Sequence, residues 1–103
     1  MTRINKIKLI SEQVTTDAIG QPTTTETTRE LIAEVRSCSM SEFMSGRQSG
    51  ITPAYIFRVS MFAYKGEKVL ELDGKRYSIY RTYESDSNEI ELYTEAELGV
   101  TNV

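Results

Sequence analysis

Apolar and polar residues alternate along most of this chain, with the period of two that is typical of β-strands with one buried face. The segment 29–37 shows the pattern most clearly, because Leu31, Ala33 and Val35 alternate with two glutamates and an isoleucine. The other segments of strand character are bounded by residues that favour turns. The predicted strands are residues 4–13, 29–37, 55–64, 68–72, 75–84 and 89–97.

Residues 68–97 carry the strongest hairpin signals. Asp73-Gly74 tolerates the positive φ angles of a two-residue turn between antiparallel strands. Such a turn places Leu70 opposite Tyr77 on the apolar face. The other pairs that this turn and a second turn at residues 85–88 predict are Glu71–Arg76, Arg76–Glu97, Tyr77–Ala96, Ile79–Thr94, Tyr80–Tyr93, Thr82–Glu91 and Tyr83–Ile90.

Arg81 does not fit this register. It falls opposite Leu92 on the apolar face, where charged side chains are seldom buried unless they are paired. A β-bulge or the end of a barrel would let its guanidinium reach water.

Two segments depart from strand alternation. Residues 15–28 are dense in Thr, Gly and Pro, which is typical of a loop or of a long, irregular hairpin. Residues 41–51 keep neither the strand period nor the helix period. Ser39 and Glu42 have the spacing of a capping box, which favours a short helix from Ser39 to about Gln48.

These elements predict one all-β domain that spans residues 1–103. Six mostly antiparallel strands with one apolar face close into a small β-barrel or fold into a sandwich, with a long loop or short helix between strands 2 and 3. The core residues that we expect are Phe57, Val59, Leu70, Tyr77, Ile79 and Leu92.

The formal net charge of −3 is unevenly distributed. Residues 82–103 contain six acidic residues and no basic one, whereas all 12 basic residues precede them. One interpretation is a solvated acidic edge strand, and the other is an acidic surface that meets a basic neighbour. In the second case the candidate subunit contacts are Glu91, Glu95 and Glu97.

The residue types on which most enzymes depend are scarce. The chain has no histidine, which removes the usual general base near neutral pH and the commonest metal ligand. Its one cysteine, Cys38, cannot form an internal disulfide and is expected to be buried or half-buried. The sequence has no phosphate-binding glycine motif and no apolar run long enough to span a membrane. We therefore expect no catalytic, metal or cofactor site, no membrane partner, and synthesis in a cytoplasm.

The tyrosines raise a nucleic-acid alternative, because small barrels bind single strands by stacking bases on exposed aromatic rings. Tyr77 and Tyr83 share the predicted apolar face, which favours core packing. Tyr80 and Tyr93 are expected on the outer face, as a cross-strand pair or an interface patch.

Several segments, in their order and spacing over about residues 4–97, resemble those of one protein family. The segments are KIKLI, DAIGQP, AEVRSCSMSEF, YIFRVSMF, DGKRYSIYRTYES and EIELYTE. This pattern resembles the head–tail joining proteins of tailed bacteriophages, which are also called head closure or head completion proteins. The most specific piece is DGKRYSIYRTYE.

The resemblance implies a structural protein of the phage neck. Self-association would give a ring of about twelve copies below the portal and its adaptor. The ring would close the DNA-filled head and provide the platform for the tail, with portal, adaptor and tail-completion proteins as partners. Phage DNA would pass through the channel without sequence-specific binding. The protein would be made in the cytoplasm of a bacterial host that carries a phage or prophage, and would end in the virion neck. The alternatives are a tail-side neck or tail-terminator component, or a small-barrel nucleic-acid-binding module.

In this family the connection after the second strand is thought to face the channel or a neighbouring ring, and here it comprises residues 37–53. We expect residues 41–50 to be mobile in the free protein, with one helical turn after Ser39. The candidate contacts to the channel or to a partner are Ser41, Glu42, Phe43, Met44, Arg47 and Gln48.

Overall fold

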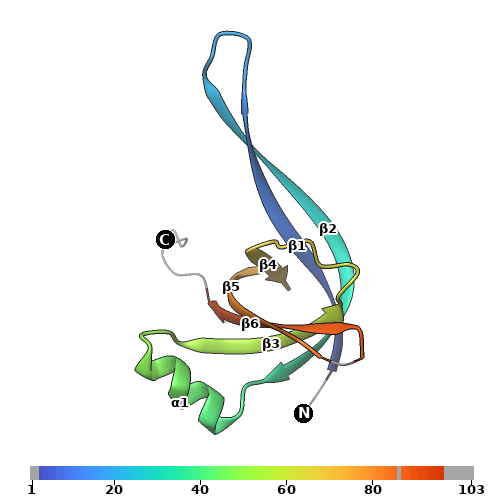
Figure 1. Ribbon diagram of the computed structural model, residues 1–103, viewed down its shortest axis with the longest axis vertical. Helices are drawn as coiled ribbons and strands as arrows, with labels where there is room; N and C mark the ends of the chain where they lie inside the picture. Colours follow the sequence, from blue (N-terminus) through green and yellow to red (C-terminus); the bar gives the residue numbers. More distant parts are fainter. Residues whose placement is uncertain (1–2, 86, 97–103) are drawn as a thin grey trace.

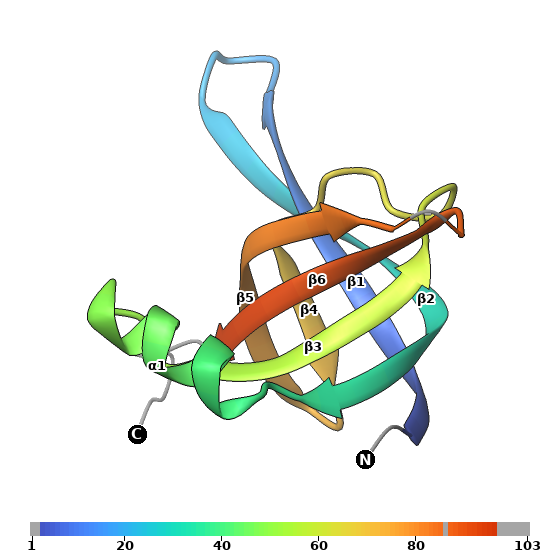
Figure 2. The same cartoon turned by 60° about the horizontal axis from the view of Figure 1, so that its bottom comes forward.

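The computed structural model describes residues 3–85 and 87–96. Six antiparallel strands close into a barrel in the order β1-β2-β3-β6-β5-β4 (Figures 1 and 2). The strands are β1 (Arg3–Thr16), β2 (Pro22–Ser37), β3 (Pro53–Ser60), β4 (Val69–Leu72), β5 (Lys75–Glu84) and β6 (Glu89–Ala96). One helix, α1 (Met40–Gln48), lies between β2 and β3. The predicted fold class is therefore confirmed, in its barrel form.

Alternating side chains from all six strands fill the barrel. Phe57 is fully buried at its centre, and the rings of Tyr55 and Tyr77 pack around it with centroids 6.0 to 6.3 Å from its own. Leu70 and Leu92 are also fully buried. The expected core residues are thus inside, except that Ile79 is only partly buried against the core.

The hairpin of β4 and β5 has the predicted register. Leu70 pairs with Tyr77 and Glu71 pairs with Arg76. Asp73 and Gly74 have φ angles of 53° and 80°, as the two-residue turn requires. This local signal was sufficient because the turn alone sets the pairing of the four residues in β4.

The predicted pairing of β5 with β6 is correct only as far as Ile79. A bulge follows at Tyr80, so that Arg81, rather than Tyr80, pairs with Tyr93. The remaining pairs shift by one residue, and Tyr83 lies opposite Glu91 with an exposed fraction of 53%. The assignment of Tyr83 to the core is therefore wrong. The bulge is the one suggested by Arg81, since it turns that side chain outward into solvent.

Strands β1 and β2 continue beyond the barrel as a long hairpin (Figure 1). Their ladder is unbroken from Arg3–Val35 to Thr16–Pro22, so the segment predicted as a loop or irregular hairpin is a regular one. Among the described residues, β4 pairs with β1 only at Lys8–Ile10. We call residues 11–28, which extend past this pairing, the arm. At its tip the carboxylate of Asp17 accepts hydrogen bonds from two backbone amides of the turn.

Helix α1 confirms the short helix predicted from Ser39 to about Gln48, and it is longer than the single turn expected of the free protein. Ser39 and Glu42 form the predicted capping box, with Ser39 Oγ accepting from Glu42 N and Glu42 Oε1 accepting from Ser39 N. Gly46 is buried because the ring of Pro53 lies against it, 2.4 Å from where a Cβ would be. The cap and this close approach, rather than an apolar stripe, account for the helix.

A buried ion pair fixes the connection between β3 and β4. The carboxylate of Glu67, whose side chain is 4% exposed, accepts two hydrogen bonds from Arg29 of β2 and one from the backbone of Lys65. Burial alone would raise the pKa of Glu67, but these hydrogen bonds hold it below its ordinary value. Glu67 is therefore a charged anchor for a loop.

Candidate assembly surface around helix α1

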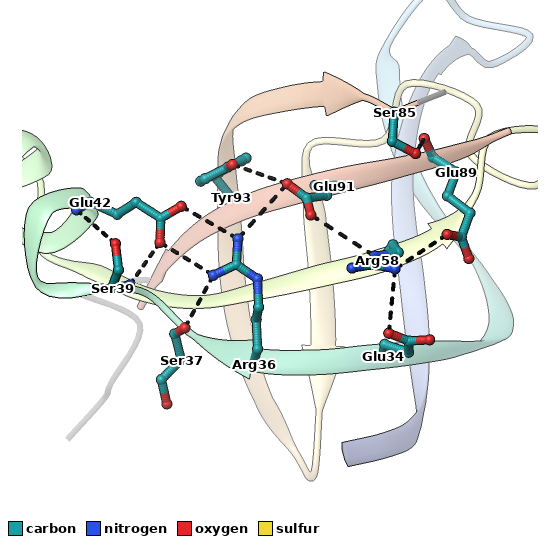
Figure 3. A network of polar contacts seen from close by, with 10 residues as sticks. All are labelled: Glu34, Arg36, Ser37, Ser39, Glu42, Arg58, Ser85, Glu89, Glu91 and Tyr93. Carbon is teal, nitrogen blue, oxygen red and sulfur yellow. Dashed lines mark hydrogen bonds and ion pairs between the residues drawn. The ribbon is translucent and has the colours of Figure 1, made fainter. Parts of the chain in front are cut away.

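Two arginines hold a polar network on the outer wall of the barrel (Figure 3). Arg58 of β3 lies 3.4 to 3.9 Å from carboxylates of Glu34, Glu89 and Glu91. Arg36 of β2 lies 3.9 Å from Glu91 as well. Glu91 thus joins the two arginines, and the network ties β2, β3 and β6 together across their outer faces.

The same network holds α1 against the barrel. Arg36 donates hydrogen bonds of 3.3 and 3.4 Å to the two carboxylate oxygens of Glu42. These bonds from Arg36, with the bond from the backbone of Ser39, hold the pKa of Glu42 below its ordinary value. Glu42 in turn raises the pKa of Arg36. The helix is therefore attached through its first turn by a charge-assisted contact.

A small apolar layer lies on this outer wall. Ile56 is 2% exposed and Tyr93 is 8% exposed, although neither belongs to the barrel core. Tyr80 packs edge-on against Tyr93, with ring centroids 6.5 Å apart. Tyr93 donates a hydrogen bond of 3.1 Å to Glu91, and burial followed by this bond raises the pKa of its hydroxyl. The outer tyrosine contact predicted from the sequence is thus present, although the bulge changes the strand pairing.

A groove of about 410 Å³ separates α1 from this layer. Three serines of the α1 segment, one per turn, line one side, and the tyrosines line the other. Arg81 is exposed in the groove and stacks over the ring of Tyr93 at 5.0 Å. No described carboxylate lies within ion-pair distance of it. The lining residues are Ser41, Glu42, Ser45, Gly46, Ser49, Ile51, Tyr80, Arg81 and Tyr93.

The candidate contact residues of the α1 segment have different surroundings. Ser41 and Glu42 line the groove, and Phe43 is half-buried. Met44 is 51% exposed. Arg47 donates a hydrogen bond of 3.0 Å to the hydroxyl of Thr52, and Gln48 is exposed. Their proposed role as contacts to a channel or partner stays a prediction.

The acidic residues named as candidate subunit contacts are less available to a partner than the sequence indicated. Glu91 is held by Arg36 and Arg58 within its own chain. Glu95 is half-buried, and Glu97 lies outside the described residues. Sequence reasoning missed the two arginines because their partners come from strands far away along the chain. The alternation of apolar and polar residues places Arg58 and Glu91 on the outward faces of their strands, and this was the available signal for the network. The signal becomes useful only once β3 is known to pair with β6.

Cys38 is half-buried, as expected, and its thiol lies 3.8 Å from the carbonyl oxygen of Ala54. Within residues 3–85 and 87–96, no three potential metal-ligating side chains gather at one place. No helix in this part of the chain has the length and apolar character needed to span a bilayer. Neither the models of protein families nor the curated proteins gave a match to this chain.

Proposed function

We propose that this protein is a structural subunit of the neck of a tailed bacteriophage, as the resemblance of its sequence segments implies. Copies of the chain would form a ring that closes the filled head and receives the tail. The observation that supports an assembly role best is the arm, because it is a long hairpin that extends beyond the barrel it belongs to (Figure 1).

The arm has features of a surface that is completed by a partner. An isolated two-stranded hairpin is marginally stable in water. Both of its edges lie outside the pairing with β3 and β4, which in the described part of the chain involves Glu34–Ser37 and Lys8–Ile10. Proteins usually protect such edges with lysines, bulges or prolines. The arm has no lysine and no bulge, and its one proline, Pro22, lies at the tip.

The structure gives little support to the nucleic-acid alternative. Tyr77 is 7% exposed and Tyr93 is 8% exposed, so neither offers a ring face for stacking bases, whereas Tyr83 is 53% exposed. Between residues 11 and 28 there are three acidic residues and no basic one, and phosphate groups would be repelled there. These observations favour an interaction with protein over one with single strands.

The test uses particles from a phage or prophage that lacks the gene. Electron microscopy should show filled heads that lose DNA and do not bind tails, and expression of the full chain should restore them. A variant in which residues 12–26 are replaced by a two-residue Asn-Gly turn keeps Ser11 opposite Thr27, and it should fold but not restore them. If the deletion leaves DNA in the heads and affects only the tails, the tail-side alternative applies. Normal infectious particles without the gene would refute a neck role.

A further inference from the structure

We propose that the tip of the arm of one copy docks into the groove beside α1 of the next copy. This contact rests on the proposed function as a ring subunit and specifies how neighbouring subunits are joined. It assigns the arm and the groove, both of which are surfaces of a single chain, to each other as partners.

The charge of the arm disfavours another arm as its partner. Its acidic residues are Glu12, Asp17 and Glu26, and the remainder of the chain contains 12 acidic and 12 basic residues. The arm therefore accounts for the whole net charge of −3. Arg76 holds Glu26 with two hydrogen bonds of 3.0 Å. Two arms side by side would bring like charges together, whereas the body of another copy would not.

The groove offers the complementary chemistry. Arg81 is exposed there without a described carboxylate partner, so its guanidinium can meet Asp17 at the arm tip. The one carboxylate that lines the groove, Glu42, is already held by Arg36. The serine and tyrosine hydroxyls can bond to the exposed backbone of a turn. Ile19 of the tip is 78% exposed, and the half-buried Ile51 lies in the groove to receive it.

The shape of the chain makes this contact intermolecular. The arm tip and α1 lie at opposite ends of a molecule that is 51 Å long (Figure 1). The six residues of β1 beyond Ile10 reach about 20 Å from the barrel, since a strand rises about 3.4 Å per residue. The arm tip at one end of the chain and the groove at the other form a head-to-tail contact between copies. Contacts of this type generate rings when the rotation from one copy to the next closes on itself.

The test is cross-linking between two purified full-length variants, both carrying Cys38→Ser. One also carries Ile19→Cys in the tip, and the other carries Ser45→Cys in the groove. They are mixed at about 1 mM, where even a contact of millimolar affinity is half formed, and treated with a short bis-maleimide. We expect a cross-linked dimer in the mixture and little or none in either variant alone. Absence of the mixed dimer overturns the docking, and so does equal cross-linking by the tip variant alone, because that indicates arm–arm contact.

A matched pair of charge reversals tests the role of Arg81. Arg81→Glu in the groove variant should lower the yield of mixed dimer about tenfold, because an attraction becomes a repulsion. Lys75→Glu, which reverses an exposed charge at the first residue of β5, should leave the yield unchanged. Equal yields for both variants overturn the assignment of Arg81. The outcome is independent of the phage role: a mixed dimer together with normal particles from the deletion strain would keep the docking and refute the neck function.

Discussion

The barrel and the arm are built from the same two strands, yet they depend on different interactions. Within the barrel, β1 and β2 bury Ile7, Leu9, Ala33 and Val35. Beyond Ile10 and Arg29 the same ladder continues with side chains that are almost all exposed. The comparison shows that backbone pairing sets the shape of a strand, whereas burial supplies most of its stability. The arm has backbone pairing but little burial, so it is suited to bury its side chains against a partner.

The largest expected difference between the two regions is in core packing. Leu70→Ala should lower the free energy of unfolding by about 2–5 kcal/mol, a large part of the roughly 5–15 kcal/mol available to a domain. Val14→Ala in the arm, where the side chain is 69% exposed, should change it by less than about 0.5 kcal/mol. Denaturant unfolding of both variants measures the difference. Equal losses would show that the arm contributes to the core of the free chain.

The ion pair of Glu67 lies at the boundary between the regions. Glu67→Gln should cost about 2 kcal/mol, since it removes hydrogen bonds to a buried charge. Because the folded state lowers the pKa of Glu67, its contribution is present above the ordinary glutamate pKa of about 4.3 and is lost as the pH falls through the lower folded value. The stability of the parent and the variant should therefore converge at acid pH. A constant difference down to pH 2 would contradict this assignment.

Loss of the N-cap of α1 should destabilise the helix without affecting the strands of the barrel. Ser39→Ala removes the N-cap and should cost about 1 kcal/mol. We expect faster hydrogen exchange of the α1 amides with little change in the exchange of β3 and β5. Ser45→Ala, on the same helix but outside the cap, is the matched control. Slower exchange of α1 in Ser39→Ala than in the control would exclude a capping role.

The smallest expected effect on folding belongs to the arm charges. Glu12→Lys should change the unfolding free energy by less than about 0.5 kcal/mol, because the side chain is exposed. Its effect should appear in association instead, and should weaken as salt is added, since exposed charges are screened over about 10 Å at 0.1 M. Cross-linking at low and high salt measures this. A substantial loss of stability would mean that Glu12 has a structural role in the free chain.

Sequence patterns predicted the parts of the fold that are specified locally. The turn at Asp73-Gly74 fixed the register of β4 with β5, and the spacing of Ser39 and Glu42 gave the start of α1. Arg81 marked the position of the bulge, but a pattern of period two could not decide between a bulge and a barrel end. One extra residue then reversed the orientation of every later side chain in β5.

The remaining features depend on contacts between distant segments. The network of Arg36, Arg58 and Glu91 requires β2, β3 and β6 to be neighbours, and no local signal specifies that order. The arm was obscured by its composition, because Gly and Pro indicate a loop while Thr, a β-branched residue, favours strands. In the structure, the turn around Asp17 and the unbroken ladder show that residues 11–28 form two paired strands and the turn that joins them.

The double use of Glu42 has a consequence for how α1 can move. One oxygen of this carboxylate, Oε1, accepts both the backbone amide of Ser39, which caps the helix, and the guanidinium of Arg36, which attaches the helix to the wall. Detaching the helix therefore weakens its cap, and uncapping it weakens its attachment. The two losses are cooperative, so α1 should behave as an all-or-none unit that is either helical on the wall or unwound and released.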